Sequence, residues 1–164
     1  MKLEYLFTTA AIGWAAALPL ADFVASLLHP TVPLSMIALV VYAAGSIVCH
    51  QLPDRSFHLW SAQMPVCARC TGIYAGAAIA AAMLLTMRAG RRGGPRRPSE
   101  PETVRRIVAA AALPTLATLI VEWTAWHTPS NAIRALAGLP LGGAVAWVIG
   151  AALVAGEHGA REDA

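Results

Sequence analysis

The chain has 164 residues, of which 57% are apolar and 13% are charged, against about 25% charged in an average soluble protein. A chain this short cannot bury so much apolar surface in one water-soluble core, so the composition excludes an ordinary soluble domain. The formal net charge is +3, but seven of the twelve basic residues lie between Arg88 and Arg106. A basic cluster between apolar runs is typical of a topology signal, and we expect no nucleic-acid partner.

Five apolar stretches reach or approach the roughly 20 residues that cross a bilayer. They cover residues 5–28, 33–49, 71–87, 107–126 and 133–155. In the first, Glu4 offsets Lys2 ahead of a run of bilayer length, unlike a signal peptide, so we expect a retained helix. The predicted fold class is all-α: a multi-pass transmembrane bundle of about five helices, forming one membrane domain over residues 1–164.

Two pairs of glycines indicate where helices pack closely. Gly72 and Gly76 open the third stretch, and Gly138 and Gly142 lie in the fifth. Glycines four residues apart share one face of a helix and let another helix backbone approach. We expect these faces to be ordinary packing surfaces.

The arginines set the expected orientation in the cell membrane. The tract 88–106 reads as a basic cytoplasmic loop. Counting five crossings outward from it puts residues 49–72 in an extracytoplasmic loop, the N-terminus outside and the C-terminus inside. Asp22 would then lie near the inner end of the first helix, where we expect an interfacial carboxylate.

The segment from Cys49 to Gly72 carries the chemical signal. It reads CHQLPDRSFHLWSAQMPVCARCTG and holds all three cysteines and two of the five histidines of the chain. Few polar residues occur elsewhere, so this concentration indicates a site. A Cys-x-x-Cys pair opens the third helix, and a Cys-His pair ends the second.

A metal site is the leading interpretation. Three thiolates and one imidazole form a tetrahedral zinc site, and the two-residue gap of Cys-x-x-Cys lets both sulfurs reach one ion. Cys49, His50, Cys67 and Cys70 supply that set, with His58 as an alternative nitrogen. The predicted cofactor is zinc or another transition metal.

Two other chemistries remain open. Cys67 and Cys70 can form a redox pair, because a helix N-terminus and the adjacent Arg69 both favour a thiolate. The pair would exchange electrons with a lipid-soluble quinone, and Cys49 would be a resolving thiol. The plainest alternative is a disulfide that only closes the loop.

These residues also resemble a known family. Cys-His-Gln at 49–51, Pro-x-Arg-Ser-Phe at 53–57 and Pro-Val-Cys-Ala-Arg-Cys-Thr-Gly-Ile-Tyr-x-Gly at 65–76 are similar to small predicted membrane proteins of bacteria and archaea, domain of unknown function twenty eighty-five. Ser130-Asn131-x-x-Arg134-x-x-x-Gly138 resembles the closing motif of that family. The resemblance implies a shared architecture and no established activity. In the fourth helix this chain has Glu122 where we expect an aspartate.

Polar residues around the cysteines suggest an anion site. The candidate anion-binding residues are Arg55, Ser56, Arg69, Asn131 and Arg134. Arginine forks bind phosphate through paired planar contacts. Glu122 is an intramembrane carboxylate, and such groups are usually paired. The alternative is that Glu122 pairs with one of these arginines and that the arginines serve structure alone.

The sequence thus predicts a membrane protein with an extracytoplasmic Cys/His metal site. That site would either serve an enzyme acting on an anionic or lipid-linked substrate or hold the loop in shape, and we expect membrane lipid as a partner. The alternatives are a membrane thiol-disulfide oxidoreductase that uses Cys67 and Cys70, and a non-catalytic protein that binds lipid or a protein partner.

Overall fold

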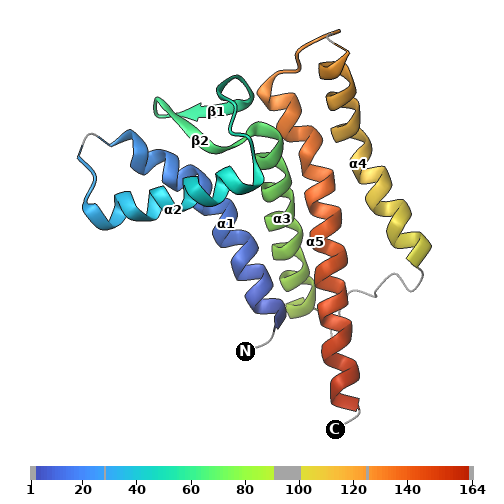
Figure 1. Cartoon of the computed structure of the whole chain (residues 1–164). Coiled ribbons are helices and arrows are strands. Elements are labelled where there is room, and N and C mark those ends of the chain that lie inside the picture. The colour runs from blue at the N-terminus through green and yellow to red at the C-terminus, as the bar shows by residue number, and fades with distance from the viewer. Residues whose placement is uncertain (1–2, 28, 91–100, 125, 163–164) are drawn as a thin grey trace.

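The computed structural model describes residues 3–27, 29–90, 101–124 and 126–162. Five helices dominate these residues: α1 (Leu3–Ser26), α2 (Val32–Val48), α3 (Ala68–Gly90), α4 (Pro101–Trp123) and α5 (Asn131–Glu162). The predicted all-α bundle is confirmed (Figure 1). Parts of the predicted loop 88–106 are helical, since 88–90 end α3 and 101–106 begin α4. Residues 91–100 lie outside the described residues.

A small β-hairpin occupies the segment predicted as a loop. A single 3₁₀ turn, Pro53–Arg55, leads into β1 (Ser56–Leu59), which pairs antiparallel with β2 (Ala62–Cys67). The turn residues Trp60 and Ser61 both have positive φ, 47° and 68°. Tight hairpin turns need such angles and usually place Asn-Gly there. The sequence lacks that signal, so the hairpin was not predicted.

Four of the five helices are long and apolar enough to cross a membrane: α1, α3, α4 and α5. At 1.5 Å per residue, the 17 residues of α2 cover about 25 Å, less than the roughly 30 Å of a hydrocarbon core. In Figure 1, α2 runs across the bundle instead of alongside α3 and α5. The expected fifth crossing is therefore not supported by the length or the direction of α2.

This arrangement bears on the expected position of the N-terminus. The first turn of α1 lies at the end of the molecule where α3 and α5 finish (Figure 1). If α1, α3, α4 and α5 are the crossings, the start of α1 and the end of α3 would lie on the same side of the membrane. An N-terminus outside and a basic loop inside would require α2 as a fifth crossing.

Asp22 is also placed differently from the expectation. Its side chain is fully buried, with 0% exposure, because this end of α1 lies beneath the hairpin. It faces the side chain of Tyr42 and the backbone of Leu59. The ring of Phe23 meets that of Trp60 edge-on, with centroids 5.3 Å apart. Asp22 is therefore part of the hairpin's support and not an interfacial carboxylate.

The glycine motifs mark the closest helix contact, as predicted. A Cβ added at Gly72 would lie 1.9 Å from the carbonyl oxygen of Ala135, and one at Gly142 would lie 1.8 Å from that of Ile73. Only hydrogen fits at these positions. α3 and α5 thus form the central pair of the bundle, and α1 and α4 pack on opposite sides of it.

We expect Gly72→Ala and Gly142→Ala each to lower the free energy of unfolding by about 1–3 kcal/mol or more, the cost of overpacking. Gly13 is the control, because nothing lies within 4 Å of an added Cβ there. Gly13→Ala should be neutral or stabilising by up to about 1 kcal/mol, through helix propensity. Thermal unfolding in detergent compares the three variants, and an equal loss in Gly13→Ala would contradict the packing argument.

The topology makes a second prediction. Tags fused before α1 and after α5 should respond alike to protease added to intact cells. The reason is that the start of α1 and the end of α5 lie at the same end of the molecule. With the basic tract inside, both tags should be cut only after lysis. Cleavage of the N-terminal tag alone in intact cells would restore the five-crossing topology.

Candidate functional site

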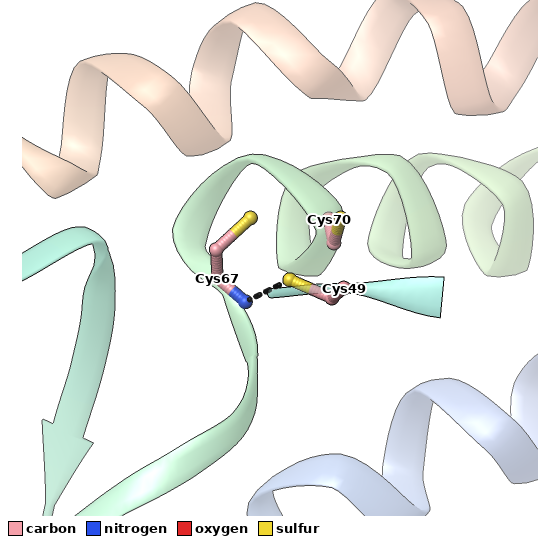
Figure 2. Close-up of side chains that lie close together, drawn as sticks. All are labelled: Cys49, Cys67 and Cys70. Atoms are coloured by element: carbon pink, nitrogen blue, oxygen red, sulfur yellow. Dashed lines mark hydrogen bonds between the residues drawn. The ribbon is translucent and has the colours of Figure 1, made fainter. Parts of the chain in front are cut away.

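The three cysteines come together at the N-terminal end of α3. Cys49 directly follows α2, Cys67 ends β2, and Cys70 lies in the first turn of α3. Their sulfur atoms all lie within 4.8 Å of one another, and none of the three forms a disulfide. Figure 2 shows Cys49 facing the start of α3, where the backbone N–H of Cys67 donates a hydrogen bond of 3.2 Å to the Cys49 sulfur. A thiolate is a stronger acceptor for such a bond than a thiol.

A network of amide side chains holds Cys49 beside β2. Gln51 adopts a positive φ of 48°, and its Nε2 donates to the carbonyl oxygens of Tyr42 at 2.9 Å and Pro65 at 2.6 Å. Nε2 of Gln63 donates to the carbonyl of Gln51 at 2.6 Å. A Cβ at Gly45 would lie 2.3 Å from the Pro65 oxygen, so glycine is what lets β2 approach α2.

His50 is not part of the group of three sulfurs, although it lines the same pocket as the cysteines, so its role as the fourth ligand stays a prediction. Cys49 has extended backbone angles, φ −146° and ψ 140°, and successive side chains of an extended chain point to opposite sides. Cys49 therefore turns inward and His50 is exposed. His58 is exposed as well, on β1. Among the described residues, the group that can hold a metal consists of the three cysteines alone.

The local fields favour a thiolate at Cys67. Its pKa is lowered from the ordinary value, chiefly because the Cys70 thiol donates a hydrogen bond to its sulfur, and burial acts in the opposite direction. Cys67 also immediately precedes α3, where the positive end of the helix dipole stabilises an anion. The cluster is thus suited to carry negative charge without a nearby lysine.

All three candidate arginines converge on Glu122. Its carboxylate lies 3.5 Å from the Arg55 guanidinium and 3.3 Å from that of Arg69, and it accepts a short hydrogen bond from Nε of Arg134. The Glu122 side chain is 2% exposed. We predicted a partner for this carboxylate, and the structure gives it three, from the 3₁₀ turn, α3 and α5.

The other two candidate anion ligands, Asn131 and Ser56, form hydrogen bonds within the protein around Arg134 and the 3₁₀ turn. Nδ2 of Asn131 donates to the carbonyl of Ser56 at 2.9 Å, and its Oδ1 accepts from Arg134 at 2.7 Å. The Ser56 hydroxyl is buried and donates to the carbonyl of Leu52 at 2.9 Å. The Ser56 hydroxyl is therefore already engaged within the protein, and an anion-binding role for it stays a prediction.

Two pockets lie beside Glu122 and its three arginines, which we call the ion cluster. One of about 400 Å³ is lined by the three cysteines together with His50, Arg55 and Arg69 and by four apolar residues that include Trp123. The other, of about 520 Å³, is polar and is lined by Arg55, Arg134, Asn131, Glu122, Asp54 and residues 128–130. Arg55 borders both, and its side chain is 43% exposed. We call the first the cysteine pocket.

Sequence reasoning missed several residues that build the site. No sequence motif marks Gln51 and Gln63 as hydrogen-bond donors within the site, although Gln51 belongs to the Cys-His-Gln string. Thr118, which accepts a hydrogen bond of 3.2 Å from Arg69, lies 49 residues away in the chain, and no local signal could have indicated it.

Comparison with known proteins supports the resemblance. Residues 49–148 match the family described as predicted membrane protein (DUF2085). An uncharacterized protein of Methanocaldococcus jannaschii is 52% identical over 40 residues, which are 24% of this chain and 26% of the relative. An uncharacterized protein of Methanothermobacter thermautotrophicus is 53% identical over 30 residues, 18% of this chain and 27% of the relative. The matches thus span about a quarter of each curated relative. No solved structure matches.

Removing the central carboxylate should destabilise the bundle. Glu122→Gln leaves three guanidiniums without their anion, and breaking a buried ion pair costs about 3–5 kcal/mol. Glu102→Gln is the matched control, because Glu102 is exposed and pairs with Arg106 within one helix turn; its loss should cost under about 0.5 kcal/mol. Denaturant unfolding in detergent measures both, and equal effects would contradict a structural role for Glu122.

The lowered pKa of Cys67 can be tested in metal-free protein. The rate of its alkylation by iodoacetamide should reach half its maximum below pH 8.5, about the value for an unperturbed cysteine. In Cys70→Ala the main hydrogen-bond donor is gone, so the midpoint should move up toward that value. Peptide mass spectrometry follows the site of modification. A wild-type midpoint at or above pH 8.5 would contradict the assignment.

Proposed function

The chain belongs to the DUF2085 family of predicted membrane proteins, and we propose that it is a membrane metalloprotein whose three cysteines bind zinc beside an anionic substrate. The observation that carries the proposal is the cysteine pocket itself. It brings three sulfurs within 4.8 Å of one another and has two arginines in the same lining.

The spacing of the sulfurs fits a shared metal ion. With Zn–S bonds of about 2.3 Å, two thiolates on one tetrahedral zinc lie about 3.8 Å apart. The observed limit of 4.8 Å requires only small movements of the side chains. The N–H bond to the Cys49 sulfur and the start of α3 both stabilise the anionic form that a metal needs.

The number of ligands favours a catalytic site over a structural one. Structural zinc has four protein ligands, whereas catalytic zinc has three and leaves a position for water or substrate. Three cysteines form the described cluster, and they line an accessible pocket. An ion held there can polarise an oxygen of the substrate or activate a water molecule.

The arginines indicate the charge of the substrate. Arg55 and Arg69 line the pocket with the cysteines, and they share Glu122 as a counterion with Arg134. Three positive charges against one negative leave a surplus, which is favourable for a phosphate or a carboxylate. A planar guanidinium fork binds either group in a bidentate manner.

Elemental analysis of the purified full-length protein tests the metal. We expect about one zinc per chain, and near none in Cys49→Ser, Cys67→Ser and Cys70→Ser, because an incomplete thiolate set loses its metal. His50→Ala and His58→Ala are the controls, and both should retain zinc. Wild-type protein without stoichiometric metal would refute the proposal, and loss of zinc in His50→Ala would restore the four-ligand set.

A thiol-disulfide oxidoreductase is the second candidate, favoured by one observation. Cys67 and Cys70 flank the start of α3 with their sulfurs close together and unbonded, as a redox pair requires. A quinone would be the electron acceptor. A reducible Cys67–Cys70 bond in metal-free wild type, absent in either serine variant, would favour this function over the metal site.

A further inference from the structure

We propose that the cysteine pocket takes a phosphate-bearing lipid, which enters laterally from the bilayer with its phosphate at Arg55 and Arg69 and its hydrocarbon chains against the apolar lining residues at the end of α2 and on α4. This inference rests on the proposed function, because it names the substrate class for the same pocket. It adds an entry route and a second recognition surface, neither of which a soluble anion would need.

The lining of the pocket contains two chemically different sets of residues. The polar set, which we call the charged wall, includes the cysteines, Arg55 and Arg69. The apolar set, which we call the apolar wall, consists of Val48 at the end of α2, Leu52 in the following turn, and Leu119 and Trp123 on α4. Val48, Leu52 and Trp123 are 56%, 47% and 76% exposed. A purely ionic ligand would leave this apolar wall without a partner, whereas an amphiphile matches both walls at once.

The apolar wall is open toward the membrane. α4 packs mainly against α5, and in Figure 1 it lies on the far side of α5 from α1 and α2. Its most hydrophobic stretch is only 11% buried, so most of its side chains face lipid. Leu119 and Trp123 therefore belong to a helix that would expose most of its surface to a bilayer. A lipid chain can reach the pocket without passing through water.

The charged wall can hold a phosphate. Nε of Arg69 is buried, and no hydrogen-bond partner for it occurs among the described residues. Arg55 contacts Glu122 at 3.5 Å through one nitrogen, and 43% of its side chain is exposed. Arg55 thus keeps exposed donors that Glu122 does not occupy, and the 13% of the Arg69 side chain that is exposed lies beside them in the pocket lining. Charge-assisted bonds to phosphate are the strongest use of such donors.

Binding of phosphatidylglycerol to the purified full-length protein, followed by native mass spectrometry, tests the proposal. Diacylglycerol, which lacks phosphate, and inorganic phosphate, which lacks chains, are the comparison probes. We expect phosphatidylglycerol to bind at least tenfold more tightly than either. If diacylglycerol binds as tightly, the phosphate group does not contribute to recognition. If inorganic phosphate binds as tightly, the hydrocarbon chains do not contribute.

Variants separate the two walls. Trp123→Ala and Leu52→Ser should weaken phosphatidylglycerol at least fivefold and leave inorganic phosphate unchanged, whereas Arg55→Gln should weaken both. Trp126→Ala is the matched control, because Trp126 is 86% exposed near the same end of α4 and does not line the pocket. It should bind like wild type. An unchanged lipid affinity in Trp123→Ala and Leu52→Ser, or the same loss in Trp126→Ala, would overturn the proposal.

The zinc content of each preparation distinguishes this inference from the proposed function. Trp123→Ala, Leu52→Ser and Trp126→Ala leave the cysteines intact and should retain zinc. If wild type holds zinc but does not bind phosphatidylglycerol, the lipid proposal fails and the metal site stands. If phosphatidylglycerol binds as expected to a protein that never holds zinc, the metal site fails and the lipid pocket stands.

Discussion

The carboxylate of Glu122 is the interaction on which the hairpin end of the bundle depends. A single negative charge there meets guanidiniums from the 3₁₀ turn, α3 and α5. An ionised group removed from water is costly unless it is paired, and this requirement links segments that are otherwise far apart in the sequence. α4 packs mainly on α5, and Glu122 also joins its C-terminal end to the 3₁₀ turn and α3.

The cysteine site uses the same region but is held by neutral hydrogen bonds. Gln51 and Gln63 fasten the turn after α2 to β2, and Gly45 leaves room for that contact. These bonds fix the backbone at Cys49 and Cys67 whether or not a ligand is present. A site with fixed backbone loses little entropy when its side chains bind a metal. The hairpin is therefore the scaffold of the site.

Arg69 connects the two regions. It stands between Cys67 and Cys70 in the chain, while its guanidinium lies 3.3 Å from Glu122 and donates to Thr118. Its backbone therefore belongs to the sulfur cluster and its side chain to the ion cluster. Arg55 has a similar double position, because it borders both pockets. Arg55 and Arg69 both contact Glu122 and both line the cysteine pocket. The two polar regions therefore lie at the same end of the bundle.

The sequence alone determined the class of the fold and the location of its chemistry. Long apolar runs require a bilayer, since water gives them no favourable environment, and α3 and α5 pack through the glycines that the spacing indicated. The three cysteines meet as the motif predicted. Only the tertiary structure decided that α2 runs across the bundle, that Asp22 lies beneath a hairpin, and that His50 is exposed beside the buried Cys49. Composition and helical spacing show which solvent a segment prefers. Contacts between distant segments fix the direction of a short helix, a turn with positive φ and a carboxylate shared by three arginines. For that reason the sequence could name Glu122 and the arginines as candidates, but only the fold could join them into one cluster.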